Sequence, residues 1–600
     1  MNRTLPYLRV LPALALVLAC SGVGLSAAPP VEARAEAPAI AAKPAAARAP
    51  RQGSILAPVD EAWVERTLAS LSTREKAGQL ILAWISGRWP DEGETARAAT
   101  WVQRDRIGGF IISNGTAPGL AAKMNALQGR ARVPLLMVTD LESGPGMRLR
   151  GSGTEFPPVM GLAATGSDSL AFGVGRVIGE EGRAVGFHLT LSPVLDVNSN
   201  PRNPIINTRS FGEDPASVGR FAADYVRGVH AGGLLAMGKH FPGHGDTHAD
   251  SHMELPSVDQ DRARLDAVDL PPFRLAIAAG VDGMLVGHIA LPRVAGDDVP
   301  ASISPKITGS ILRGEMGFRG LVSTDAFNMR GLTRRYGQGD AAIRAIQSGA
   351  DILLQPEDIP GVLNAVEAAV RDGRITQARL DESVRRVLAA KTRVRLQHQR
   401  TVDLAAVPRI VGSAEHRRLA SEVAARSITL VRDERRLVPL AAGARRILSI
   451  TYGATGSVFD AALAGEGRTV ERARATEGMG AAAFAALRAR AGAADVVIVS
   501  AHVIPVQYRG SVEAGGAFTR FVEEMARAGR PVIVVSFGSP YLLRAFPSVS
   551  TYMLAWGSEA VCQEAAARAV LGRASIGGRL PVTIMPGVAR GAGLDRPVAR

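Results

Sequence analysis

Four of the ten histidines of the chain fall between positions 240 and 252. They share this stretch, which begins at Lys239 and directly follows the apolar run 234–237, with two aspartates and two glycines. Polar side chains at the end of an apolar run are typical of a loop that a buried strand delivers to an active centre. The stretch could also be a solvated, histidine-rich loop, so the rest of the sequence has to decide.

Asp250 and His252 are separated by one residue, so in an extended loop their side chains point to the same side. The Asp250 carboxylate can then bond one imidazole nitrogen of His252, fix its tautomer and leave the other nitrogen free. An imidazole held in this way can donate a proton to a leaving group and later take one from water. We therefore predict a base–carboxylate dyad.

A further carboxylate, Asp325, comes directly after the apolar run 320–324. A buried strand would hold it on rigid backbone. From there it could act as a nucleophile or stabilise a developing oxocarbenium ion. The alternative is that Asp325 caps the helix that follows.

A metal site competes with this interpretation, because the four histidines are spaced by four residues. Zinc sites use that spacing on a helix. Pro242, Gly243 and Gly245 disfavour a helix here, so we predict neither a metal nor another cofactor. A zinc hydrolase would instead bind stoichiometric zinc and lose activity with a chelator.

The first part of the chain, 57–394, alternates apolar, strand-like runs with helix-like segments. The strand candidates are 78–85, 108–113, 135–139, 189–197, 234–238, 281–288, 320–324 and 351–355, and helix candidates include 168–186, 215–231, 271–279 and 339–348. Eight strands separated by helices predict a parallel (β/α)8 barrel of the TIM type.

Catalytic residues of such a barrel lie where its strands end. Polar residues do follow five of the eight runs: Asp140 and Glu142, Asp196 and Asn198, Lys239 and His240, His288, and Asp325. Any one of them could be structural, but their agreement on one face of a barrel favours a shared active site.

We place a linker at 395–413 and a smaller α/β sandwich domain with a mostly parallel sheet at 414–600. Its strand candidates are 428–431, 446–451, 495–501, 532–536 and 551–555, with helix candidates at 414–425, 481–491, 516–528 and 560–571. No glycine-rich phosphate loop is present, so we infer no nucleotide. We expect this domain to pack against the barrel, and the sequence does not say whether it reaches the pocket.

The chain carries a net charge of +14 with both signs scattered along it, so we expect no nucleic acid partner. An apolar fraction of 46% supports globular folding. We expect a monomer or weak dimer, although the sequence does not give the oligomeric state. No segment after the leader is long and apolar enough to cross a membrane.

Residues 1–27 are predicted to be a signal peptide, because two arginines precede the short apolar run 10–19. The run ends in a Leu-Ala-Cys sequence at Cys20 that resembles a bacterial lipobox, so Cys20 would be lipidated. Cleavage after 26–28 would instead release the protein. Residues 28–56 are predicted to be an Ala/Pro-rich tether. The protein is therefore expected to be exported, either to the periplasm, to a membrane through Cys20, or out of the cell. The other cysteine, Cys562, leaves no disulfide within the mature chain.

The stretch 239–245 followed by Asp250-Ser251-His252 resembles the signature of glycoside hydrolase family 3, in its β-N-acetylglucosaminidase branch. Other stretches that resemble the motifs of this family are 71–80, 192–198, 209–215 and 322–329. The resemblance covers about residues 60–580, including the second domain.

The resemblance implies that Asp325 is the nucleophile of a retaining, two-step reaction, with His252 as acid/base and Asp250 as its dyad partner. It also implies a set of residues that bind the hydroxyls and acetamido group of the sugar: Asp140, Arg148, Arg209, Lys239 and His240. The expected reaction removes a terminal, non-reducing β-linked N-acetylglucosamine from peptidoglycan- or chitin-derived fragments. The substrate would then be an amino-sugar oligosaccharide or a muropeptide.

The sequence departs from the family pattern after the third strand, where Ser143 and Pro145 replace a usual glycine and arginine. This leaves the substrate detail at that wall open. A phosphorylase is one rival, because a neutral histidine in place of a carboxylate would not repel phosphate. Other rivals are a β-glucosidase or β-xylosidase of the same family, which lack the Asp-Ser-His loop, and an inactive cell-wall-binding lipoprotein.

Overall fold

The computed structural model describes residues 58–454, 458–465 and 467–599, which belong to one compact unit. The predicted signal peptide, the tether and Cys20 lie outside the described residues.

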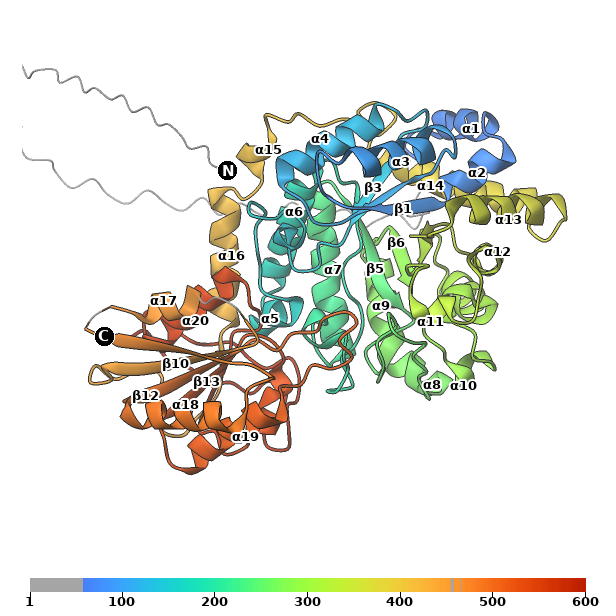
Figure 1. The fold of residues 1–600 in the computed structure, drawn as a ribbon. Coiled ribbons are helices and arrows are strands. Elements are labelled where there is room, and N and C mark those ends of the chain that lie inside the picture. The colour runs from blue at the N-terminus through green and yellow to red at the C-terminus, as the bar shows by residue number, and fades with distance from the viewer. Residues whose placement is uncertain (1–57, 455–457, 466, 600) are drawn as a thin grey trace, which may run out of the picture. The chain divides into compact units, whose positions relative to one another are not determined.

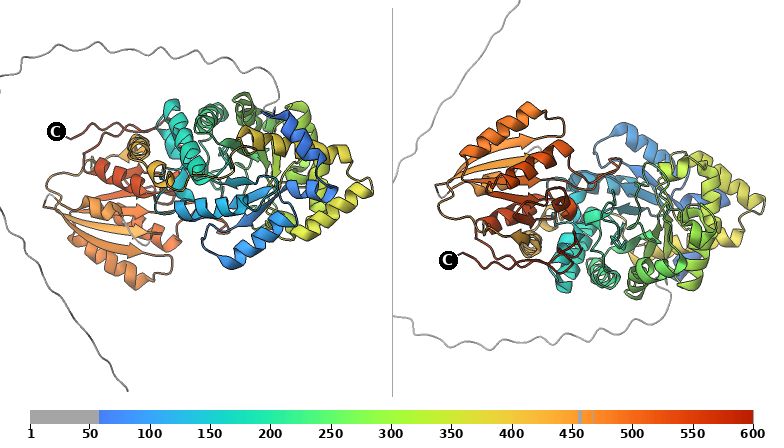
Figure 2. Two further views of the ribbon diagram at one scale, coloured as in Figure 1. Left: turned by 90° about the horizontal axis from the view of Figure 1, so that it is seen from above. Right: turned by 90° about the horizontal axis from the view of Figure 1, so that it is seen from below.

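Eight parallel strands form a barrel surrounded by helices (Figures 1 and 2). The strands are β1 (Ile81–Ile85), β2 (Gly109–Ile112), β3 (Leu136–Thr139), β4 (Leu189–Thr190), β5 (Leu235–Phe241), β6 (Gly283–Val286), β7 (Leu321–Thr324) and β8 (Leu353–Leu354). The sheet runs from β7 through β1 to β8, and a bridge between Ser323 and Ile352 joins its two edges. The predicted barrel is therefore confirmed.

Most predicted strands differ in length from the observed ones, and two of the differences have a clear structural reason. The strand predicted at 78–85 begins only at Ile81, because α2 (Thr73–Gln79) precedes it. A capping box fixes the start of α2, since the Ser72 hydroxyl accepts from the Glu75 amide and the Glu75 carboxylate accepts from the Ser72 amide. The run 189–197 contributes only the two residues of β4, and the chain then leaves the sheet for the active-site side.

Helices lie at all four positions predicted for this part. Besides α2, the helices of this part are α1 (Glu61–Ala69), α3 (Glu92–Gln103), α4 (Ala117–Gln128), α5 (Val159–Ala164), α6 (Asp168–Val185), α7 (Pro215–Ala231), α8 (Arg262–Arg264), α9 (Leu270–Ala278), α10 (Pro292–Ala295), α11 (Arg330–Thr333), α12 (Gln338–Ser348), α13 (Ile359–Arg371) and α14 (Gln377–Arg393). Wider π-turns cover Leu265–Asp269 and Pro305–Glu315. Helices α6 and α7 pack closely at glycines: a Cβ on Gly175 would lie 2.2 Å from the Tyr225 carbonyl oxygen.

A second sheet has the strand order β11-β10-β12-β13-β14-β9, with only β9 antiparallel to its neighbour. The strands are β9 (Thr429–Asp433), β10 (Arg446–Tyr452), β11 (Thr469–Ala475), β12 (Val496–Ala501), β13 (Val532–Ser536) and β14 (Thr551–Leu554). All five predicted strands are present. The prediction missed β11, an edge strand whose charged, mostly exposed residues give no apolar face.

Helices cover both faces of the second sheet (Figure 1). On one face lie α18 (Ala481–Ala493) and α19 (Gly516–Arg527), and on the other α16 (Ala414–Ser427), α17 (Val458–Leu463) and α20 (Ala560–Val570). The region predicted as a linker includes α15 (Val407–Ile410) and buries Leu396 and Val411 in the barrel's hydrophobic core, so it is packed near both of its ends, whereas much of 398–409 is exposed.

The second domain is tied to the barrel by specific hydrogen bonds. Asn198 Nδ2 donates to the Tyr541 hydroxyl over 2.7 Å, and the Glu213 carboxylate accepts from the backbone and hydroxyl of Thr583. Within the described residues, no helix has the length and apolar character needed to span a membrane.

Candidate active site

A cavity of about 810 Å³ opens at the carboxyl ends of the barrel strands. Its lining includes Asp325, His252 and the five predicted sugar-binding residues, which are Asp140, Arg148, Arg209, Lys239 and His240. Asp250 lies behind His252 and is buried. The structure thus brings together the predicted site residues, which come from the ends of four strands, β3, β4, β5 and β7.

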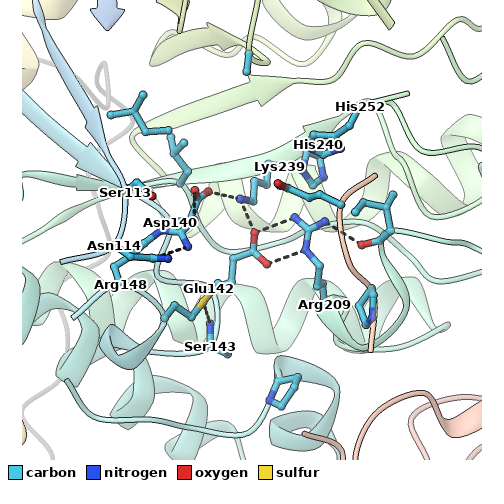
Figure 3. Close-up of a pocket in the computed structure, with 18 of the residues that line it drawn as sticks. Ser113, Asn114, Asp140, Glu142, Ser143, Arg148, Arg209, Lys239, His240 and His252 are labelled. Atoms are coloured by element: carbon cyan, nitrogen blue, oxygen red, sulfur yellow. Dashed lines mark hydrogen bonds and ion pairs between the residues drawn. The ribbon is translucent and has the colours of Figure 1, made fainter. Parts of the chain in front are cut away.

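Charged side chains of alternating sign cross one wall of the cavity (Figure 3). Asp140 accepts from Arg148 Nη2 and from Lys239 Nζ, both over 2.8 Å. Lys239 Nζ also lies 2.6 Å from Glu142 Oε1. Arg209 donates two hydrogen bonds of 2.9 Å to the same carboxylate, from Nε and Nη2. Such a row presents fixed donors and acceptors to the hydroxyls of a sugar.

These groups hold one another in their charged forms. Burial would raise the pKa of Asp140, but Lys239 and Arg148 lower it to about 2. The pKa of Glu142 likewise falls well below its usual value, since Arg209 and Lys239 outweigh burial. The two carboxylates in turn raise the pKa of Lys239 against the effect of its burial.

Glu142 links Lys239 to Arg209, but sequence reasoning did not include it among the site residues. The available signal was its spacing from Asp140: at i and i+2 after a strand, two acids can serve the same cavity. Ser143 and Pro145 lie just beyond. The Ser143 amide lies 3.1 Å from Met147 Sδ, and Pro145 begins a short 3₁₀ turn.

The predicted dyad is formed. His252 Nδ1 lies 2.7 Å from Asp250 Oδ1, and the His252 amide donates to the same oxygen over 3.0 Å. Burial would raise the pKa of Asp250, but the hydrogen bonds and charge of His252, together with a backbone amide of the second domain, lower it. With Nδ1 engaged, Nε2 is the nitrogen that remains for a substrate.

Asp325 directly follows β7, and its amide donates to the Val286 carbonyl of β6 over 2.9 Å. Its Oδ1 accepts from the Ala326 amide over 2.8 Å. Burial would raise its pKa, but the nearby histidines, His288 foremost, lower it. The next helix, α11, begins at Arg330 and has no side-chain cap, so the capping interpretation of Asp325 is wrong.

Asp196 organises the first half of the histidine-rich loop. Its buried carboxylate lies 2.7 Å from His240 Nδ1 and accepts from the His244 amide over 2.7 Å. His244 then bridges the loop, with Nδ1 2.7 Å from the Thr247 hydroxyl and Nε2 3.0 Å from the Ser251 hydroxyl. These bonds fold the chain so that residues 250–252 reach the cavity.

The remaining histidine of the stretch, His248, is exposed, and its Nδ1 lies 3.1 Å from Asn200 Nδ2. Among the residues that the structure describes, no three His, Cys, Asp or Glu side chains are grouped so that they could hold a metal ion.

The second domain also lines the cavity, which the sequence left open. Its contributions are Ile504, Pro505, Gln507 and Tyr508 after β12 and Gly557, Ser558 and Glu559 after β14. Burial and the charge of Glu155 raise the pKa of Glu559 to about 7. No sequence signal identified these residues, because they lie in loops of another sheet and belong to none of the recognised motifs.

Two family models match the chain. The model described as the glycosyl hydrolase family 3 N terminal domain matches residues 72–390, and the one described as its C-terminal domain matches 428–593. The chain belongs to glycosyl hydrolase family 3. The family predicted from the motifs is therefore confirmed, and the two matches coincide with the barrel and the second sheet.

One similar protein covers most of the chain, and another covers about half of it. The chain is 33% identical over 553 residues, 87% of this chain and 95% of the relative, to a beta-N-acetylglucosaminidase/beta-glucosidase of Cellulomonas fimi. It is 36% identical to a beta-hexosaminidase of Stenotrophomonas maltophilia over 292 residues, which are 46% of this chain and 84% of that relative.

Two solved structures have a fold similar to that of this chain. A beta-N-acetylglucosaminidase from Paenibacillus sp. str. FPU-7 superposes with a TM-score of 0.78 at 31% identity, covering 86% of this chain and 99% of that one. The beta-glucoside phosphorylase BglX superposes with a TM-score of 0.81 at 29% identity, covering 88% and 97%.

Asp269 contacts the turn of the histidine-rich loop in this family 3 barrel. A Cβ on Gly243, whose φ is 140°, would lie 2.8 Å from the Asp269 Cβ, so the turn of the loop rests on this residue. Neither Asp269 oxygen has a hydrogen bond of regular geometry within the described residues; Gln260 lies close by, and Arg264 Nη1 is 3.8 Å away. Burial, only partly offset by Arg264, raises the pKa of Asp269 to about 7.

Replacing Asp269 with asparagine should stabilise the protein at pH 8 and change little at pH 4. The folded state keeps the Asp269 proton up to about pH 7, whereas the unfolded chain releases it near 3.8. The free energy of unfolding of the wild type therefore falls as the pH rises from 3.8 to about 7. At 1.36 kcal/mol per pKa unit, the loss is up to about 4 kcal/mol. Denaturant unfolding at both pH values measures this loss, which the variant should not share.

Asp266 provides a matched control with the opposite sign. It is partly exposed on the same π-turn, and hydrogen bonds from Arg262 lower its pKa despite some burial. Asp266→Asn should thus cost some stability at pH 8 and less at low pH. Parallel stability–pH curves for wild type and Asp269→Asn would contradict the assignment of the proton to Asp269.

Proposed function

We propose that the protein is a retaining β-N-acetylhexosaminidase that removes terminal β-linked N-acetylglucosamine, with Asp325 as nucleophile and His252 as acid/base. The observation that carries this proposal is that Asp325 and the Asp250–His252 dyad meet at one cavity beside the charged row from Arg148 to Arg209. The names of the relatives from Cellulomonas fimi and Paenibacillus support the choice of sugar.

In the first step, Asp325 attacks the anomeric carbon while His252 Nε2 donates its proton to the leaving oxygen. The lowered pKa of Asp325 keeps the nucleophile ionised. As His252 donates its proton, Asp250 holds the proton on Nδ1 and so preserves the tautomer. The bond between carbon and leaving oxygen breaks as the bond to Asp325 forms.

In the second step, a water molecule attacks the sugar bound to Asp325. His252 Nε2, now neutral, takes the proton of that water, and the Asp325 carboxylate is released. Two displacements at the same carbon retain its configuration. Asp140, Arg148, Arg209, Lys239 and His240 hold the sugar through both steps.

The natural substrate is proposed to be an amino-sugar oligosaccharide or muropeptide from peptidoglycan or chitin. The leader supports this, because export would bring the enzyme to such fragments in the periplasm or outside the cell. A lipid on Cys20 would anchor the protein, which we expect to be a monomer or weak dimer. Mass analysis of the mature N-terminus of wild type and Cys20→Ala tests the anchor.

Turnover of a panel of aryl glycosides tests the activity. The N-acetylglucosaminide should be cleaved far better than the glucoside or xyloside, with β-configured sugar released first. Preference for glucoside or xyloside would replace the proposal with a glucosidase or xylosidase. No turnover of any aryl sugar would favour an inactive binding protein.

A phosphorylase is the second candidate, favoured by the imidazole acid/base and by the similarity to the beta-glucoside phosphorylase BglX. An ionised carboxylate at the position of His252 would repel an incoming phosphate, and a neutral imidazole does not. For a hydrolase, free sugar should be the product with and without phosphate. Sugar 1-phosphate formed at millimolar phosphate would overturn the hydrolase.

A further inference from the structure

The loop between β12 and α19, residues 502–515, runs from the second sheet to the dyad. Four of its residues line the cavity that contains Asp325 and His252: Ile504, Pro505, Gln507 and Tyr508. The second domain therefore supplies part of the wall against which a leaving group would lie.

Tyr508 contacts both members of the dyad. Its amide donates to Asp250 Oδ2 over 2.8 Å, and its ring stands edge-on to His252, with ring centroids 5.2 Å apart and planes at 67°. The other oxygen, Asp250 Oδ1, accepts a hydrogen bond from the His252 amide and lies 2.7 Å from His252 Nδ1. Both oxygens of Asp250 are thus occupied, one by the barrel's own loop and one by the second domain.

The direction of the Tyr508 amide depends on the rest of its loop. Tyr508 has a φ of 66°, in the left-handed region that non-glycine residues adopt only where their surroundings impose it. The barrel contacts Tyr508 itself, and contacts within the second domain hold the residues on either side of it. The Arg509 guanidinium pairs with Glu477 over 2.5 Å, and the Val503 carbonyl accepts from the Ser539 amide over 2.7 Å.

A carboxylate held through both oxygens keeps its orientation and charge. Burial works against ionisation of Asp250, while the His252 and Tyr508 hydrogen bonds favour it. An ionised Asp250 stabilises the imidazolium and keeps the Nδ1 proton in place, which orients Nε2. Without the hydrogen bond from the Tyr508 amide, Asp250 could change its orientation, and the His252 ring would then be free to rotate.

The chemistry itself does not require a second domain. The Stenotrophomonas maltophilia relative matches through 292 residues that make up 84% of its chain. It is therefore too short to contain both a barrel of this size and a second sheet. The Tyr508 amide is an addition in this two-domain chain, outside the minimal catalytic set.

We propose that Tyr508 is a positioning residue for proton transfer: through its amide the second domain holds Asp250, and through Asp250 it holds His252. The proposal rests on the proposed function, in which His252 is the acid/base. It assigns the second domain a part in the chemical step in addition to its packing against the barrel.

Three variants of the full-length protein separate the amide from the ring. Tyr508→Pro removes the N–H donor. Tyr508→Gly keeps the donor, tolerates the left-handed conformation and removes the ring. Val506→Ala changes an exposed side chain of the same loop that does not line the cavity.

Two substrates separate a loss of proton transfer from a general loss of turnover. One is an N-acetylglucosaminyl disaccharide, and the other is a dinitrophenyl N-acetylglucosaminide, whose leaving group needs no acid.

Tyr508→Pro should lower kcat/KM for the disaccharide by about 10–100-fold, as loss of a supporting partner does elsewhere. Its KM should stay within about twofold, and kcat/KM for the dinitrophenyl sugar should fall less than about threefold, because only proton transfer suffers. The acidic limb of the pH profile should move to higher pH, since Asp250 loses a donor to its anionic form. Val506→Ala should stay within about threefold of wild type on both substrates. Tyr508→Gly removes a ring that lines the cavity, so any loss should be of similar size on both substrates, without the selectivity of the proline variant.

Because proline cannot adopt a φ of 66°, Arg509→Ala provides a second test that leaves every amide in place. By releasing the loop from Glu477 it should reproduce the selective loss for the disaccharide at about 3–10-fold, with an unchanged unfolding temperature. Equal losses on both substrates for Tyr508→Pro and Arg509→Ala, or a loss for Tyr508→Gly that is as selective for the disaccharide as that of proline, would overturn the proposal. If His252→Ala shows no selectivity, the proposed function itself fails. If His252→Ala is selective and the loop variants are not, only the role of Tyr508 fails.

Discussion

Asp325→Ala should reduce turnover by about 10⁵-fold or more on every substrate, the order of loss seen when the nucleophile of another covalent mechanism is removed. Without this carboxylate no covalent intermediate can form, whatever the leaving group. The loss should therefore be the same for the disaccharide and for the dinitrophenyl sugar. Steady-state kinetics on both substrates measure it, with the unfolding temperature as a check on folding.

Azide gives this variant a second, sharper readout. Alanine leaves space for a small anion where the Asp325 carboxylate stood, on the face of the sugar opposite the leaving group. Azide bound there can attack the anomeric carbon as dinitrophenolate departs, which gives the α-glycosyl azide. Retained turnover without azide, or an azide product of β configuration only, would remove Asp325 as the nucleophile.

The barrel could be predicted from the sequence because each strand carries a short apolar run and the polar residues follow it. Lys239 and Asp325 illustrate this: Lys239 lies near the carboxyl end of buried strand β5 and Asp325 directly follows β7, so their positions in the cavity follow from the fold class alone. The Asp250–His252 pairing was equally local, since the two side chains are only two positions apart.

Contacts between distant segments could not be predicted in the same way. Glu142 acquires its role only because Lys239 and Arg209, from elsewhere in the chain, both reach it. Tyr508 lies 258 positions from Asp250 and contacts it through a backbone amide, which every residue except proline possesses. A residue type carries no information about such a bond, so only the folded chain reveals it.

His252→Ala should lower kcat/KM for the disaccharide by about 10²–10⁴-fold, the contribution of a general acid. The dinitrophenyl sugar should lose less than about tenfold in kcat/KM, because its leaving group departs as a stable anion without a proton. The structure supports this division of labour: Nδ1 of His252 is committed to Asp250, and the side chain lines the cavity beside Asp325. A series of aryl sugars with graded leaving groups gives the dependence directly.

The same variant should accumulate the sugar bound to Asp325, because the second step also needs His252, now as the base for water. Azide needs no base, so it should restore turnover of the dinitrophenyl sugar and yield the β-glycosyl azide, the opposite configuration from Asp325→Ala. Asp250→Asn, which keeps the shape but removes the charge behind His252, should show the same selectivity with a smaller loss.

If His252→Ala instead loses equally on all leaving groups and azide restores nothing, the proton must come from another group. The raised pKa of Glu559, a second acid on the wall of the same cavity, would make that carboxyl the next residue to replace.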